Sequence, residues 1–270
     1  MKRQWIRKYS VFINNFPSEV VIDDLRIIFK IIKTRQISSN KCNLKIYNLK
    51  PETRAIFEGE DVRLTLEAGY QDESGLIFKG NVKRSSFKKV GPDWITDILI
   101  ADGDKALREV NFQKSYVAGI DIKNVISDIV DKMKSEGRVI SKSLKNISSE
   151  ILQKGLSVTG IAEEILDKLI DKQGLEVHIQ NEEIVFVDPK GDIGRPEINI
   201  TPETGLIGSP IRREKNGIQF ESLINHNMIP GSLINLKSKD INGLFVIRKQ
   251  SIQGDSQGNP WFMKSEGIPR

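Results

Sequence analysis

The side chains that most often carry catalysis are few in this sequence and lie far apart. The two histidines, His178 and His226, have no nearby partner motif. Ser209, in a Gly-Ser-Pro turn, lacks the flanking pattern of a nucleophile elbow, and no glycine-rich phosphate loop occurs. A histidine within a strand is usually structural, so we interpret His178 as part of the fold. The sequence predicts no catalytic residue, no cofactor-binding residue and no metal ligand.

Paired carboxylates could indicate glycoside hydrolysis, which needs an acid and a base or nucleophile across one cleft. The candidates are Asp23-Asp24, Glu163-Glu164 and Glu182-Glu183. Adjacent residues point to opposite faces of a strand and lie about 100° apart on a helix, so none of these pairs can act alone. Carboxylates distant in the sequence could still meet, which keeps a wall-degrading enzyme open as an alternative.

A second acidic segment, Gly59 to Asp61, could be proposed as a metal-binding loop. Calcium loops need more oxygen ligands at regular spacing than Glu60 and Asp61 provide. We therefore interpret this segment as a solvated turn.

Composition limits the classes of partner. The 270 residues contain 41 Lys and Arg against 36 Asp and Glu, a net charge of +5, which is too small a surplus to indicate specific DNA binding. The single cysteine, Cys42, excludes an intrachain disulfide and a multi-cysteine zinc site, and it fits assembly in a reducing compartment.

The amino-terminal residues are basic, but they do not form a secretion signal. The apolar run that follows them is broken by Ser10, Asn14, Asn15 and Pro17. No segment approaches the roughly 18 uncharged apolar residues of a membrane helix. The nearest, Leu25 to Ile32, carries two cations, so we expect neither export by this route nor a membrane-spanning segment.

Strands should dominate the first hundred residues, because apolar and polar side chains alternate from Val20 to Trp94 and a last strand follows from Trp94 to Ile100. Val62 to Ala68 is the clearest half-buried strand, with its apolar residues on one face. Short turns separate five or six such segments, a pattern typical of a sandwich or barrel.

The spacing of apolar residues becomes helical after about Lys105. Asp121 is a plausible N-cap for a helix that ends at Gly137, and a second helix is expected from Thr159 to Gly174. A shift of 40 positions aligns their apolar residues, so the segment is a weak internal repeat. A hairpin that turns at Asn181 offers these helices a sheet to cover.

Strands return after the linker that ends at Pro196. They are expected at Glu197 to Ile200, Leu206 to Arg212, Ile218 to Leu223, Ser232 to Leu236, Leu244 to Ile252 and Pro260 to Lys264. Turn residues such as Asn216-Gly217 and Asn242-Gly243 separate them.

Two ordered sets of turn motifs carry a resemblance. The first set is N-L-K-P-E-T-R, G-E-D-V-R-L-T-L-E-A-G-Y, L-I-F-K-G-N-V and A-D-G-D; the second is G-L-I-G-S-P, G-I-Q-F-E-S-L-I-N and I-P-G-S-L-I-N-L, followed by Gly254-Asp255 ahead of Trp261. In this order they resemble baseplate hub proteins of contractile-tailed bacteriophages, a family related to the spike hubs of contractile bacteriocins and type VI secretion systems.

The resemblance implies a mainly β fold with an α/β insertion. Two tube-like β barrels, residues 1–110 and 191–270, would flank a small helix-containing domain, residues 111–190. It also implies a structural protein without enzymatic activity or cofactor, located in the virion tail baseplate and assembled in the host cytoplasm.

The same resemblance implies specific partners. Three copies would form a homotrimer, a ring of six barrels that joins the sixfold tail tube to the threefold central spike. Its neighbours would be the tail tube protein, the central spike protein and other baseplate proteins. Its lumen would pass the tape-measure protein and DNA, both only in transit.

A different class of function is a tail-associated module that binds cell-wall glycan or degrades peptidoglycan. The helical segment is weakly similar to a LysM module, although its internal repeat argues against that assignment because a LysM unit needs about half this span. The two hypotheses differ in a simple way, since a hub should be a trimer without turnover and a hydrolase should act as a monomer.

The candidate subunit interface is one face of the expected strand from Leu25 to Ile32. Its second face carries Arg26, Ile28, Lys30 and Ile32. This mixture suits a neighbouring subunit that covers the isoleucines and leaves the cationic tips in water.

Overall fold

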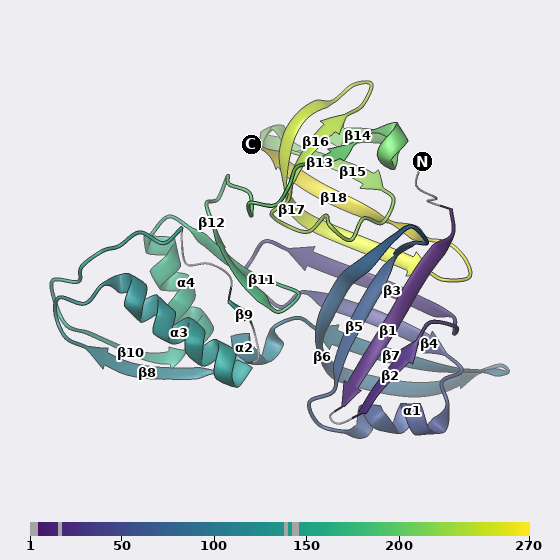
Figure 1. Ribbon diagram of the computed structural model, residues 1–270, viewed down its shortest axis with the longest axis horizontal. Coiled ribbons are helices and arrows are strands. Elements are labelled where there is room, and N and C mark those ends of the chain that lie inside the picture. The colour runs from purple at the N-terminus through teal and green to yellow at the C-terminus, as the bar shows by residue number, and fades with distance from the viewer. Residues whose placement is uncertain (1–4, 16–17, 138–139, 142–145) are drawn as a thin grey trace.

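The fold comes from a computed structural model, which describes residues 5–15, 18–137, 140–141 and 146–270 (Figure 1). Residues 1–4, 16–17, 138–139 and 142–145 lie outside the description, including the first residues of the basic amino-terminal segment and Pro17. Among the described residues, no helix has the length and apolar character needed to cross a membrane.

The first β region contains seven strands and two short helices. They are β1 (Arg7–Asn15), β2 (Ser18–Ile22), β3 (Ile27–Thr34), β4 (Lys41–Tyr47), α1 (Pro51–Ala55), η1 (Ile56–Glu58), β5 (Arg63–Tyr70), β6 (Glu73–Val90) and β7 (Asp93–Ala101). The alternation in the sequence predicted β3 to β7. It did not predict β1, which pairs with β5 along eight residue pairs.

The middle region contains the longer helices and two small sheets. Its elements are α2 (Asp104–Arg108), β8 (Asn111–Tyr116), α3 (Ile122–Gly137), β9 (Ile140–Ser141), β10 (Leu156–Ile161), α4 (Ala162–Lys172), β11 (Glu176–Gln180) and β12 (Glu183–Val187). β8 pairs with β10, and β12 pairs with both β11 and β9. In Figure 1 this region lies beside the two β regions.

The last β region follows the order expected from the sequence. Its elements are β13 (Ile198–Ile200), η2 (Pro202–Thr204), β14 (Leu206–Arg212), η3 (Glu214–Asn216), β15 (Ile218–Ser222), β16 (Leu233–Lys237), β17 (Asn242–Asp255) and β18 (Trp261–Pro269). The predicted turn at Asn242-Gly243 is wrong, because both residues belong to β17 and pair with β16.

Strands of both β regions form one hydrogen-bonded sheet. The path runs β14-β15-β18-β17-β3-β4-β7-β6-β5-β1-β2, with β16 beside β17 and β13 beside β16. The connection between the regions is the antiparallel pairing of β17 with β3. The mainly β fold is confirmed, but no closed barrel is found among the described residues, so the two-barrel architecture and its boundaries at residues 110 and 190 stay predictions.

The buried hydrophobic residues fall into two groups. One contains residues of both β regions, such as Leu44, Phe78, Phe220 and Met263, because the alternating strands turn their apolar faces toward a shared interior. The other lies in the middle region, where α3 and α4 cover the small sheets. The middle region, called the insertion below, thus has a hydrophobic core separate from that of the β regions.

The insertion helices bury the apolar residues that their spacing predicted. In α3 these include Val125, Ile126 and Ile129, and the Asp121 carboxylate accepts a hydrogen bond from the Lys123 N–H at 2.9 Å, which caps the helix. α4 starts at Ala162 and not at Thr159, because residues 156–161 pair with β8.

Candidate functional site

One face of the central sheet is largely uncovered within the chain. Strands alternate along the run β14-β15-β18-β17-β3-β4-β7-β6, so every second side chain points away from the core. The exposed side chains on this open face are Lys30, Ile32, Lys41, Asn43, Arg84, Ser86, Lys88, Ile207, Ile211 and Lys249. The face is polar, with more cations than anions and a few isolated isoleucines.

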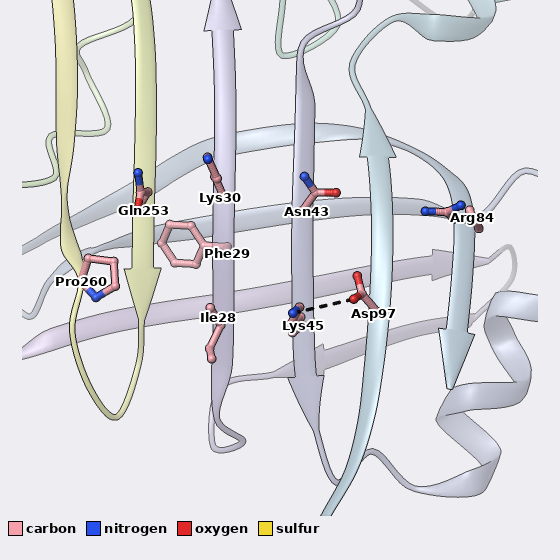
Figure 2. Close-up of a pocket in the computed structure, with 9 residues that line it drawn as sticks. All are labelled: Ile28, Phe29, Lys30, Asn43, Lys45, Arg84, Asp97, Gln253 and Pro260. Atoms are coloured by element: carbon pink, nitrogen blue, oxygen red, sulfur yellow. Dashed lines mark ion pairs between the residues drawn. The ribbon is translucent and has the colours of Figure 1, made fainter. Parts of the chain in front are cut away.

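A shallow pocket of about 500 Å³ lies in the middle of the open face (Figure 2). It is lined by side chains from β3, β4, β6, β7 and β17, together with Pro260: Ile28, Phe29, Lys30, Asn43, Lys45, Arg84, Asp97 and Gln253. Lys45 and Asp97 form an ion pair across neighbouring strands at 3.9 Å. This lining contains no histidine or cysteine, and it resembles a contact surface more than a reaction centre.

The predicted interface residues lie on this open face or at its margin. Ile28 is half-buried, Lys30 is exposed, and Ile32 is 41% exposed. Arg26 precedes β3, and its guanidinium donates two hydrogen bonds to the Asp255 carboxylate, at 3.2 and 2.7 Å. Both backbone edges of β3 are occupied, by β4 and β17, so this strand can contact another molecule only through its side chains.

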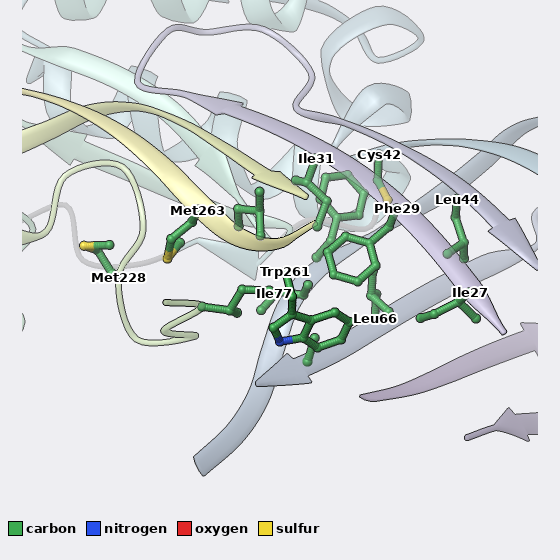
Figure 3. Close-up of a cluster of buried hydrophobic side chains, with 14 of the residues drawn as sticks. Ile27, Phe29, Ile31, Cys42, Leu44, Leu66, Ile77, Met228, Trp261 and Met263 are labelled. Atoms are coloured by element: carbon green, nitrogen blue, oxygen red, sulfur yellow. The ribbon is translucent and has the colours of Figure 1, made fainter. Parts of the chain in front are cut away.

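The joint between the two β regions is tightly packed. Phe29 of β3 meets Trp261 of β18 edge to face, with ring centroids 5.5 Å apart (Figure 3). Gly254 lies between them, and a Cβ atom there would collide with the Phe29 ring. The Arg26 guanidinium holds the pKa of the Asp255 carboxyl below its usual value, so the joint also contains an ion pair.

A buried polar cluster joins the insertion to the first β region. The Asp102 carboxylate accepts hydrogen bonds from the backbone N–H groups of Asn181 and Glu182, both at 2.6 Å. The Lys33 ammonium donates to the Asn181 side-chain oxygen at 2.8 Å. Asn40 donates to the Ile179 carbonyl oxygen at 2.8 Å, so these bonds hold three residues of the β11–β12 hairpin, Ile179, Asn181 and Glu182.

Charges inside this cluster are strongly perturbed. Burial raises the pKa of Asp102 to about 6, although Lys33 and the hydrogen bonds partly oppose the shift. Burial also lowers the pKa of Lys33 to about 8, against the opposing effect of Asp102. Both side chains are almost fully buried, so each charge depends on the other for compensation.

His178 lies in β11 and is fully buried. Burial, together with the nearby Arg35 and Arg248 charges, lowers its pKa to about 3, so the ring is neutral at physiological pH. Arg35 and Arg248 both pair with Glu176, at 3.0 and 2.7 Å. This position agrees with the structural role inferred for His178 from the sequence.

The carboxylate pairs considered for hydrolysis are not brought together into one cleft. Glu182 is buried and forms ion pairs with Lys79, at 3.0 Å, and with Arg63. Glu163 and Glu164 lie in the first turn of α4. Within the described residues, no group of three or more His, Cys, Asp or Glu side chains is placed to hold a metal ion.

The comparisons with known proteins agree with this architecture. A family model described as "Baseplate hub gp41" matches residues 10–267, nearly the whole chain. The chain belongs to this baseplate hub family. The resemblance inferred from the turn motifs is therefore confirmed. A comparison with curated protein sequences found no match.

Solved structures share the fold of this hub chain at low sequence identity. The 43 kDa tail protein of prophage MuSo2 from Shewanella oneidensis has a TM-score of 0.66 at 8% identity, covering 97% of this chain and 98% of that one. A Neisseria meningitidis tail protein gives 0.64 at 9%, with 96% of each chain covered. A type VI secretion component of E. coli gives 0.65 at 10%, covering 96% of this chain and 76% of that one.

The buried cluster was not predicted from the sequence. Its members form no motif, because the first and last of them are 148 positions apart; they are Lys33, Asn40, Asp102 and Asn181. One feature of the sequence could have indicated the cluster. Lys33 follows Ile31 on the apolar side of β3, and a lysine on a buried face needs a polar partner.

Proposed function

We propose that this hub chain is a trimeric adapter between a sixfold tail tube and a threefold central spike. The observation that carries the proposal is a repeated pattern of strand pairing. The first β region contains the run β3-β4-β7-β6, and the last contains β14-β15-β18-β17 in the same antiparallel order. One chain thus presents two related four-stranded surfaces.

Details of the two runs correspond residue by residue. The β6–β7 pairing has an irregularity between Val82 and Arg84, and the β17–β18 pairing has one between Ile247 and Lys249. When the two runs are aligned at these irregularities, Asp97 of β7 and Lys264 of β18 occupy the same position. Both form a cross-strand ion pair, with Lys45 at 3.9 Å and with Glu221 at 3.5 Å. The same alignment superimposes Trp94 on Trp261.

The correspondence extends to a fifth strand and then ends. β5 pairs with the first half of β6, as β16 pairs with the first half of β17. The next strands differ, because β1 runs antiparallel to β5 whereas β13 runs parallel to β16. We propose that the tail tube contacts the strands common to both β regions, which are the two four-stranded runs with β5 and β16 beside them.

Three such chains would present six related surfaces, which matches a sixfold tube while keeping threefold symmetry for a spike. The open face would line a lumen for the tape-measure protein and DNA in transit. The tail tube protein, the central spike protein and other baseplate proteins would be the partners, within the virion tail. Arg26, Ile28, Lys30 and Ile32 lie on this open face or at its margin, so their candidate contact with a neighbouring copy is an alternative to lining the lumen.

The test is the assembly state of the full chain, alone and with the tail tube protein of the same particle. Light scattering should give the mass of three copies, and electron microscopy should show a ring that caps tube ends. A protein that stays monomeric with the tube protein present would contradict the adapter. Clearing of a peptidoglycan gel by the purified monomer would favour the wall-degrading alternative.

A further inference from the structure

Two short stretches of chain connect the insertion to the β regions. Residues 102–103 lead from β7 into α2, and residues 188–197 lead from β12 into β13. Each stretch contains a glycine in the left-handed region, Gly103 at φ 64° and Gly194 at φ 67°. A body that is held at two points can turn about the line through them without breaking a covalent bond. The two connections therefore define one axis for the insertion.

A group of polar contacts lies at each end of this axis. At the first connection, Asp102 accepts hydrogen bonds from the turn of the β11–β12 hairpin. At the second connection, Arg35 donates a hydrogen bond to the Gly191 carbonyl oxygen at 2.8 Å. Arg35 and Arg248 also share the Glu176 carboxylate. Contacts near an axis move little when the body turns, so both groups of contacts can persist during such a motion.

The two hydrophobic cores are separate, so a motion at the joint can leave both of them intact. Among the described residues, the core of the β regions contains none from the insertion. The insertion core is contacted by a single hydrophobic side chain from the described part of the β regions, Ile37 in the β3–β4 connection. Because each core is packed within itself, the insertion and the β regions can each behave as a rigid body.

The β11–β12 hairpin lies between the insertion helices and the β regions (Figure 1). Alternate residues of β11 belong to the insertion core, so His178 and Gln180 face the β regions. Gln180 donates a hydrogen bond to the Thr34 carbonyl oxygen at 2.7 Å. On β12, Val185 and Val187 share this face. The hairpin thus presents a mixed surface, more polar than apolar, and domains that meet at such a surface are expected to move relative to each other.

A cleft beside the axis provides space in which the insertion can turn. It has a volume of about 400 Å³ and lies between the β3–β4 connection and α4. One wall carries Gln36 and Ile37, and the other carries Asp167, Lys168 and Asp171. Because α4 packs on the hairpin and not on the line between the connections, turning the insertion changes the width of this cleft. Widening the cleft removes Ile37 from the insertion core.

We propose that the insertion turns as one body about the line through its two connections, and that the contact of Ile37 with the insertion core holds the closed position. The β regions keep their shared sheet during this motion. The motion lets the insertion follow a neighbouring protein while the sheet stays in place. The inference concerns a single chain and does not depend on the trimeric adapter.

Pulsed electron paramagnetic resonance on spin-labelled cysteine pairs measures this motion directly. The natural Cys42 is fully buried, so added cysteines at exposed positions take the label. The pair across the joint is Lys134→Cys in α3 with Lys237→Cys in β16. Two control pairs each share one site with it. They are Lys8→Cys with Lys237→Cys inside the β regions, and Lys134→Cys with Ser157→Cys inside the insertion.

The labelled chain is diluted with a large excess of unlabelled chain before assembly, so that distances between copies do not contribute. We expect the distribution of distances across the joint to be at least about twice as wide as in either control pair, because only the first pair joins the two bodies. Circular dichroism establishes that every variant is folded.

Ile37→Ser is the variant that should release the closed position. Ile37 is half-buried, and loss of its contact should raise the ratio of open to closed molecules about fivefold. The matched control is Ile151→Ser, which removes an isoleucine of the insertion that is 52% exposed. Only Ile37→Ser should shift the distances across the joint, and neither variant should change the control pairs.

The outcomes separate the motion from the role of Ile37. The motion is overturned if the distribution across the joint is as narrow as in the control pairs, both in the natural sequence and in Ile37→Ser. Equal widening of all three pairs also overturns it, because the insertion would then not move as one body. A wide distribution that Ile37→Ser and Ile151→Ser leave equally unchanged overturns the role of Ile37. None of these results depends on whether three copies form a ring.

Discussion

The change Asp102→Asn should destabilise the attachment of the insertion. The carboxylate is fully buried and accepts two backbone hydrogen bonds at 2.6 Å, from Asn181 and Glu182. Asparagine keeps the shape, but its NH₂ group faces one of these backbone N–H donors, so that buried donor loses its acceptor. Leaving a buried donor unsatisfied costs about 1–3 kcal/mol. We expect a loss of about 2 kcal/mol, because the amide oxygen still accepts the other bond.

The matched control is Asp97→Asn. Asp97 pairs with Lys45 at 3.9 Å, and both side chains are about two-fifths exposed or slightly less. Such surface pairs contribute about 0–1 kcal/mol. The two variants therefore make the same change from carboxylate to amide, at one site that is buried and accepts backbone hydrogen bonds and at another that is partly exposed.

Urea unfolding measured by two signals is the assay. Far-ultraviolet circular dichroism follows α3 and α4 in the insertion, whereas tryptophan fluorescence follows the β regions, which contain all three tryptophans. Asp102→Asn should lower the midpoint of the helical signal most. The reasoning is refuted if Asp102→Asn and Asp97→Asn differ by less than about 0.5 kcal/mol, which is within the ordinary range for surface changes.

Three further changes test other parts of the structure. The pKa of Asp102 is raised from 3.8 to about 6, so between these values the folded state keeps a proton that the unfolded chain has released. This group should therefore make the free energy of unfolding fall as pH rises from about 4 to 6. In Asp102→Asn, urea midpoints measured against pH should lack this contribution to the fall. Gly254→Ala places a methyl group against the buried Phe29 ring and should cost about 1–3 kcal/mol by urea unfolding; an unchanged midpoint would show that the ring can move. Ile28→Lys with Ile32→Lys changes only the open face, so circular dichroism should stay native; if light scattering finds that trimers become monomers, this face is a subunit contact, and if the mass is unchanged, it is not.

Most strands could be predicted from the sequence because alternation is a local property. Residues 63–68 and 218–222 alternate apolar and polar side chains and are flanked by turn residues, so their strands need no knowledge of distant contacts. The segments at residues 111–116 and 156–161 were missed as strands because Lys114 interrupts the apolar side of the first and Gly160 interrupts that of the second. The helix N-cap at Asp121 was predictable for the same local reason as the strands.

The tertiary structure alone decided how these elements join. Pairing of β17 with β3 connects residues more than 200 positions apart, and its register depends on packing such as Phe29 against Trp261. Local periodicity predicts which side chains lie on each face of a strand. It does not predict which other strand pairs with that strand. The partnership of Lys33 and Asp102 likewise exists only after folding, because a buried charge is tolerated only where distant parts of the chain supply its compensation.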